Sequence, residues 1–201
     1  MILKKILFDF MSESKPLLIA GFAGSLRKGS YNRMLLYAVL ELLPRNVRLE
    51  ILDLGIIPLF NQDLEYDMPV AVKEFKEKIK KADALLIITP EYNSSIPSVL
   101  KNALDWASRP YGDNSLDGKP IAIMSVSTGI LGGARAQTHL RQILSSLNAY
   151  VVNKPEVIVN FADEKFDGNG KFKDERARAL IMQLLENLIK LAEVLKTNAK
   201  S

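Results

Sequence analysis

Short apolar runs alternate with amphipathic stretches along most of this chain. The runs are rich in aliphatic residues and have the length of buried strands. They cover residues 17–22, 47–53, 83–89, 120–126 and 150–159. The second run alternates apolar and polar positions, which is typical of a strand at a sheet edge, and Pro155 interrupts the fifth. Apolar residues then recur at helical spacing and predict helices over residues 31–43, 69–82, 96–108, 133–148 and 174–196.

The alternation of strands and helices predicts the fold class. Strands that alternate with helices form a parallel sheet with helices on both faces. Five strands and five helices favour an α/β, flavodoxin-like sheet of order 2-1-3-4-5, whose ligands bind beyond the carboxyl ends of the strands. Because no repeat or linker divides the chain, we expect one domain over residues 17–197. The residue pattern of positions 1–16 differs from that of the rest of the chain. We therefore expect these residues to form an N-terminal extension, which is either ordered or disordered.

A polar loop joins the first predicted strand to the first helix, at residues 24–33. Such a junction gathers backbone N–H groups and the positive end of a helix dipole around one point. The loop adds hydrogen-bond donors and one cation from Ser25, Arg27, Ser30 and Asn32. Neither a P-loop lysine nor a G-x-G-x-x-G pattern is present, so the loop suits one terminal phosphate. The alternative is a polar turn in which serines cap the helix.

Two further loops follow the third and fourth predicted strands. Residues 89–97 offer the planar ring of Tyr92 and the amide of Asn93; Pro97 suits the first helical turn, with Ser94 or Ser95 as cap. Residues 125–134 contain glycines that would let the backbone approach a flat ligand. In a parallel sheet all three loops emerge at one edge. Together they predict a site for a mononucleotide with a ring system.

The amino-acid composition excludes several classes of functional site and partner. The chain has no cysteine and one histidine, which excludes disulfides, thiolate metal sites and thiol redox chemistry; any redox reaction must use a bound cofactor. The net charge of +4 is mild, and aromatic residues do not interleave with a basic stripe, so we expect no nucleic-acid partner. No apolar run is long enough to span a membrane, and the first ten residues lack the features of a signal peptide. We therefore expect a cytoplasmic protein without a metal site or a membrane partner.

The motifs in the three loops resemble the NADPH-dependent FMN reductases, and within that family most closely the bacterial quinone and chromate reductases. The similarity runs from about residue 17 to residue 159. The motifs that carry it are Gly24-Ser25-Leu26-Arg27-Lys28-Gly29-Ser30-Tyr31-Asn32, Thr89-Pro90-Glu91-Tyr92-Asn93 with Pro97-Leu100-Lys101-Asn102-Ala103-Asp105-Trp106, and Gly132-Gly133-Ala134-Arg135 with His139-Leu140-Arg141.

The resemblance implies FMN as cofactor, NADPH or NADH as co-substrate, and a homodimer or homotetramer with flavin sites near a subunit interface. Carried over to this chain, it places the FMN phosphate on Ser25, Arg27, Ser30 and Asn32. It places the isoalloxazine along Pro90, Glu91, Tyr92 and Asn93. It places the far side of the ring and the ribityl chain along Ser125, Ser127, Thr128 and Gly129. Ser94 and Thr138 depart from the tyrosines that close relatives often carry.

The sequence thus predicts an FMN-dependent NAD(P)H oxidoreductase that transfers two electrons from a reduced nicotinamide to a small-molecule acceptor. Quinones, chromate, azo compounds and free flavin all fit, and because FMN carries the chemistry no side chain is assigned a catalytic role. A flavodoxin-type one-electron carrier, against which the positive net charge argues, and a non-catalytic flavin-binding module are the alternatives. We expect Trp106 in the core or at an interface and His139 in a structural or interface role, and Arg135 and Arg141 either pair with acids such as Glu156 or are solvated.

Overall fold

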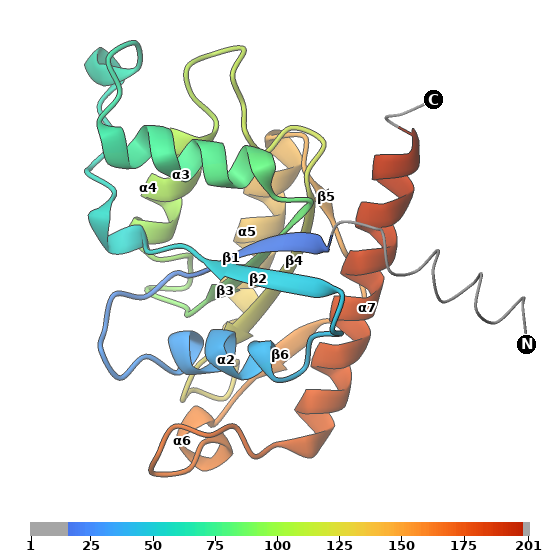
Figure 1. Ribbon diagram of the computed structural model, residues 1–201. Coiled ribbons are helices and arrows are strands. Elements are labelled where there is room, and N and C mark those ends of the chain that lie inside the picture. Colours follow the sequence, from blue (N-terminus) through green and yellow to red (C-terminus); the bar gives the residue numbers. More distant parts are fainter. Residues whose placement is uncertain (1–15, 199–201) are drawn as a thin grey trace, which may run out of the picture.

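A parallel sheet forms the centre of the molecule in a computed structural model that describes residues 16–198 (Figure 1). Its strands are β1 (Leu17–Ala23), β2 (Val47–Ile51), β3 (Ala84–Thr89), β4 (Pro120–Val126), β5 (Tyr150–Val151) and β6 (Val157–Val159). The order is β2-β1-β3-β4-β5, with β6 also paired to β4. This confirms the predicted flavodoxin-like order. The extension expected at residues 1–16 lies outside the described residues, apart from residue 16.

Burial along the strands follows their position in the sheet. Every residue of β3 and β4 is buried, as expected for central strands covered on both faces. In β2 only Val47 is buried, and β2 pairs with β1 alone. The alternating pattern of this run therefore identified an edge strand correctly.

The fifth predicted strand is wrong as one element. Residues 150–159 form two short strands, and both pair with β4. β5 lies beside Pro120 and Ile121, and β6 lies beside the stretch from Met124 to Val126. Pro155 lies between them and has no N–H to donate to a ladder, so the pairing is interrupted there.

Helices cover both faces of the sheet (Figure 1). α2 (Tyr31–Leu40) and α7 (Glu175–Asn198) pack on one face; α3 (Val70–Lys81), α4 (Ser98–Ala107) and α5 (Ala134–Ser146) pack on the other. Three short elements were not predicted: η1 (Leu54–Ile56), η2 (Gln62–Leu64) and α6 (Ala162–Lys165). Predicted helix bounds agree within a few residues. α2 ends three residues early because Pro44 disfavours helical backbone just before it. Within residues 16–198, no helix is both long and apolar enough to cross a membrane.

Two hydrophobic cores flank the sheet because strand side chains alternate between its faces. Leu86 and Ile88 of β3 belong to the core beneath α2 and α7, whereas Leu85 and Ile87 belong to the core beneath α3, α4 and α5. The second core includes Trp106, which is fully buried, as predicted. Its indole Nε1 donates a hydrogen bond of 2.9 Å to the carbonyl of Pro58.

Candidate functional site

The loops that follow β1, β3 and β4 meet around one open cleft of about 320 Å³. They meet because the carboxyl ends of parallel strands lie at one edge of the sheet. Of the predicted site residues, all except Asn93, Ser125 and Gly129 line this cleft. Tyr31 and Val126 line it as well and were not predicted. The full lining is Ser25, Arg27, Ser30, Tyr31, Asn32, Pro90, Glu91, Tyr92, Val126, Ser127 and Thr128.

One end of the cleft is the start of α2. Ser30 is the N-cap of this helix, and its Oγ accepts a hydrogen bond of 3.4 Å from the backbone N–H of Arg33. The backbone N–H groups of Tyr31 and Asn32 have no acceptor among the described residues. Unpaired N–H groups at the positive end of a helix dipole attract an anion. The hydroxyls of Ser25 and Ser30 lie at the same end.

Arg27 lies exposed on the rim of this end. Its Nη2 donates a hydrogen bond of 2.7 Å to the carbonyl of Gly29, and its guanidinium carbon lies 5.7 Å from the ring centre of Tyr31. A guanidinium carries five N–H donors, so the bond to Gly29 leaves others for a ligand.

Asn32 anchors the loop after β1 to the centre of the sheet. Its Nδ2 donates a hydrogen bond of 3.0 Å to the carbonyl of Val126, at the end of β4. The side chain is buried, and its Oδ1 has no partner among the described residues. The amide group therefore positions the loop, and the backbone N–H of Asn32 is the donor that stays free for a ligand.

A tight hairpin turn forms the loop after β3. Tyr92 and Ser95 exchange two backbone hydrogen bonds of 3.0 Å each, and Asn93 and Ser94 between them have φ angles of +50° and +63°. Two successive positive φ angles correspond to a type I′ turn and are unusual for residues other than glycine. The turn leaves Tyr92 half exposed on the cleft and Asn93 exposed outside it.

The expected serine cap on α4 is wrong. Pro97 occupies the N-cap position and makes no side-chain hydrogen bond to the helix. Ser94 and Ser95 belong to the hairpin turn, and the Oγ of Ser95 lies 3.0 Å from Nδ1 of His139. The only histidine of the chain therefore makes a structural contact and does not line the cleft.

Glu91 joins the loop after β3 to the start of α5. Its Oε2 accepts hydrogen bonds from the backbone N–H groups of Arg135, at 3.0 Å, and Ala136, at 3.3 Å. Its Oε1 lies 3.7 Å from Nη1 of Arg135, which also donates to Ser94 Oγ at 3.2 Å. Arg135 thus pairs with Glu91, while Arg141 donates to the carbonyl of Val152 at 3.2 Å. Through these contacts the carboxylate of Glu91 holds the loop after β3 against the end of the loop after β4.

The loop after β4 contributes Ser127 and Thr128 to the cleft. Ser125 lies beneath them, fully buried, and its Oγ accepts a hydrogen bond of 3.0 Å from Nε2 of Gln137. Gly129 lies exposed beyond the cleft, where its N–H donates to Ser127 Oγ at 3.2 Å.

Two glycines of this loop allow it to pack closely on the sheet. Gly132 and Gly133 have φ angles of +57° and +95°. A Cβ added to Gly132 would lie 2.6 Å from Ile158 Cγ2, and one added to Gly133 would lie 2.6 Å from Ser125 Cβ. Their missing side chains therefore allow the loop to pack closely on β4 and β6.

The arrangement fits a flavin mononucleotide. Free N–H groups and hydroxyls at the start of α2 suit one phosphate, while Pro90, Tyr92 and Thr128 border the space beside it. The cleft has the volume of a small-molecule site. No cluster of three or more histidine, cysteine or acidic side chains that could hold a metal ion is present within residues 16–198.

Comparisons with known proteins identify the family. A sequence model of the family described as NADPH-dependent FMN reductase matches residues 17–164. The NAD(P)H-dependent FMN reductase of Pseudomonas aeruginosa is 47% identical over 176 residues, which cover 87% of this chain and 95% of that protein. The 2-hydroxy-1,4-benzoquinone reductase of a Burkholderia species is 42% identical over 168 residues, covering 84% and 92%.

A solved structure shares the fold as well. The flavoenzyme FerB, an NAD(P)H:(acceptor) oxidoreductase from Paracoccus denitrificans, superposes with a TM-score of 0.81 at 36% identity. The match covers 88% of this chain and 97% of that one. The protein is therefore an oxidoreductase that belongs to the NADPH-dependent FMN reductase family.

Proposed function

We propose that the protein is an FMN-dependent NAD(P)H oxidoreductase that reduces quinones or similar small-molecule acceptors. The observation that carries the proposal is the open cleft in which phosphate-binding groups and planar, polar ring neighbours meet. The names of the relatives support a nicotinamide donor and a quinone or flavin acceptor. Chromate and azo compounds are further candidate acceptors, because an open cleft admits acceptors of different shapes.

In this proposal the chain positions its ligands, and FMN, when bound, supplies the two-electron chemistry. The N–H groups of Tyr31 and Asn32, the hydroxyls of Ser25 and Ser30, and Arg27 hold the phosphate. Pro90, Glu91 and Tyr92 lie along one side of the ring, with Asn93 at the outer end of the turn.

The loop after β4 holds the other side of FMN. Ser127 and Thr128 border the ring and the ribityl chain, while Gly129, just outside the cleft, and the buried Ser125 shape the loop that carries them. The open face of the cleft admits donor and acceptor. We further propose a homodimer or homotetramer that acts in the cytoplasm, where nicotinamide cofactors are at hand.

Two measurements on the purified protein test this function. Denaturation should release FMN, which chromatography distinguishes from FAD. The protein should then oxidise NADPH or NADH continuously when a soluble quinone is present, with assays that lack quinone or protein as controls. Release of FAD, or failure to take up any flavin on reconstitution, would overturn the cofactor assignment. Nicotinamide oxidation that never depends on the acceptor would favour a carrier or a non-catalytic flavin-binding module.

A further inference from the structure

Gln137 is a buried polar residue of α5 to which the proposed function assigns no role. Its side chain lies in the protein interior, since the residue is only 3% exposed. Its Nε2 donates a hydrogen bond of 2.7 Å to the carbonyl of Val157 on β6 and one of 3.0 Å to Oγ of Ser125 on β4. One amide group thus joins α5 to two paired strands, close to the point where β4 ends and its loop begins.

The amide of Gln137 is not explained by packing alone. Its Oε1 is buried and has no hydrogen-bond partner among residues 16–198. A buried polar atom without a partner lowers stability, whereas an apolar side chain of the same size contains no such atom. The two donated bonds are therefore what the amide contributes at this position, and they fix β4, β6 and α5 relative to one another.

The residue before Gln137 is bonded to the other loop that borders the proposed ring site. The backbone N–H of Ala136 donates to Oε2 of Glu91, in the loop after β3, at 3.3 Å. Gln137 bonds to Ser125, which lies two residues before Ser127 in the lining of the cleft. Consecutive residues of one helical turn are thus attached to the loop after β3 and to the end of β4. Because the backbone of one turn is rigid, these contacts fix the spacing of the two loops.

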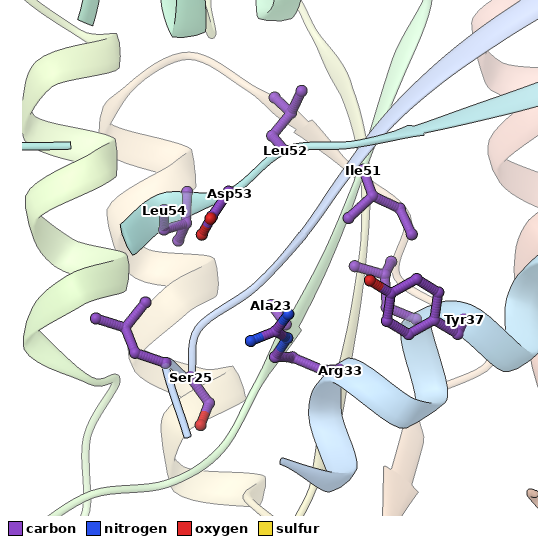
Figure 2. Close-up of a pocket in the computed structure, with 10 residues that line it drawn as sticks. Ala23, Ser25, Arg33, Tyr37, Ile51, Leu52, Asp53 and Leu54 are labelled. Atoms are coloured by element: carbon purple, nitrogen blue, oxygen red, sulfur yellow. The ribbon is translucent and has the colours of Figure 1, made fainter. Parts of the chain in front are cut away.

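The loop after β1 is supported by a different helix. A pocket of about 240 Å³ lies beside this loop, between α2, the end of β1 and the segment from Ile51 to Leu54 (Figure 2). Ser25 lines both this pocket and the cleft, and no described residue of α5 lines the pocket. The bond from Asn32 to the carbonyl of Val126 does not involve Gln137. A change of Gln137 should therefore act on the ring side of the cleft and leave the proposed phosphate-binding groups in place.

We propose that Gln137 is a positioning residue for the flavin, because its bonds to Ser125 and Val157 fix the spacing of the two loops that border the isoalloxazine ring. The proposal rests on the proposed function, since it requires FMN in the cleft. Gln137 does not line the cleft, so it acts through the loop after β4 and not by contact with the ring. The spacing of these loops determines whether both can contact a planar ring at the same time.

Flavin binding by the purified, flavin-free protein tests the proposal. Gln137→Met keeps the length of the side chain but removes both donated bonds, and it should weaken FMN binding about tenfold. Riboflavin, which has the same ring and lacks the phosphate, should lose affinity by the same factor. Gln142→Met is the matched control, because Gln142 is exposed on the same helix. At saturating FMN, the visible circular dichroism of the bound flavin should change in Gln137→Met and not in the control. A residue that only stabilised the fold would leave that spectrum unchanged.

A milder variant covers the case in which Gln137→Met does not fold, which far-ultraviolet circular dichroism detects. Ser125→Ala removes one acceptor and leaves the bond from Gln137 to Val157, and it should weaken the binding of both flavins about threefold. Added to Gln137→Met, it should weaken binding no further, since the bond between the two residues is already absent.

Wild-type flavin affinity and a wild-type flavin spectrum in folded Gln137→Met, or in Ser125→Ala if Gln137→Met does not fold, would overturn the proposal. A loss of affinity for FMN that riboflavin does not share would place the effect at the phosphate and would overturn it as well. A wild-type protein that binds neither flavin would show instead that the proposed function itself is wrong.

Discussion

The carboxylate of Glu91 accepts a hydrogen bond of 3.0 Å from the backbone N–H of Arg135, 44 residues further along the chain. This contact fixes the loop after β3 against the first turn of α5, where a carboxylate also compensates the positive end of the helix dipole. Because Glu91 lines the cleft, it is a candidate proton donor to a bound ligand. Its contacts indicate instead that it shapes the cleft by holding two of the three loops together.

Substitution of Glu91 tests this positioning role. Glu91→Ala should lower the free energy of unfolding by about 1–2 kcal/mol, the effect of losing a helix cap. Glu91→Gln keeps a side-chain oxygen for the two N–H groups and should recover most of that loss. Urea denaturation measures both variants. In quinone assays Glu91→Gln should lose far less than the roughly 100-fold in kcat expected on removing a general acid. A loss of that size in a variant of native stability would show that Glu91 transfers a proton.

Ser30 has two roles that one pair of substitutions separates. Ser30→Ala removes the cap on α2 and should reduce stability by about 0.5–2 kcal/mol. Ser30→Asp keeps a capping oxygen and should retain stability, but it places a negative charge where the phosphate is proposed to bind. FMN affinity should therefore fall much more in Ser30→Asp than in Ser30→Ala. Thermal unfolding and titration of the flavin-free protein with FMN measure the two effects. If a folded Ser30→Asp variant bound FMN as tightly as the wild type, the phosphate would not bind at the start of α2.

Arg27 is expected to contribute one charge-assisted contact to the phosphate. Arg27→Ala should weaken FMN binding by about 1.5–3 kcal/mol, since the free N–H groups of the loop remain. Lys28→Ala is the matched control, because Lys28 is the adjacent exposed cation and does not line the cleft. FMN titration of the two variants gives the comparison. Equal dissociation constants for Arg27→Ala and Lys28→Ala would show that Arg27 is a solvated side chain that does not contact the phosphate.

An ion pair far from the cleft makes stability depend on pH. Asp83 accepts from the N–H of Leu18 at 2.9 Å and from Nζ of Lys196 at 2.8 Å. Burial raises the pKa of Asp83, but these two contacts outweigh it, and the pKa lies below its ordinary value of 3.8. A carboxyl group whose folded pKa is depressed adds stability above its unfolded pKa and loses that contribution as the pH falls through the folded value.

Asp83→Asn should therefore cost about 1 kcal/mol at pH 7. The difference from the wild type should shrink as the pH falls below 3.8. Urea denaturation across this range measures it. Lys196→Met should show the same trend, because it removes the other half of the pair. A difference that stayed constant down to pH 2 would mean that Asp83 acts through its shape and not its charge.

The sequence predicted the features that depend on local patterns. The continuous apolar runs over β3 and β4 predicted strands buried on both faces, which the structure shows. The polar loop before Tyr31 contains Ser30, the residue that caps α2. The remaining features depend on contacts between distant residues. Nothing in the local sequence indicated that Asn32 would bond to Val126 or that Glu91 would cap α5.

Two further misses have local causes. Asn93 and Ser94 adopt positive φ angles that residues other than glycine seldom take, so the turn was not foreseen and serine caps were assigned instead. Pro155 was noticed, but it ends one strand and a second begins at Val157, which an apolar run alone does not indicate.

We expect one cleft of this protein, loaded with FMN, to take electrons from a nicotinamide and to give them to a quinone. Absorbance of the bound flavin under nitrogen tests it most directly. One equivalent of NADPH should bleach the flavin band completely, and one equivalent of a soluble quinone should then restore it, with neither change in flavin-free protein. A flavin band that NADPH leaves unchanged, or that quinone fails to restore, would show that the cleft does not carry out this electron transfer.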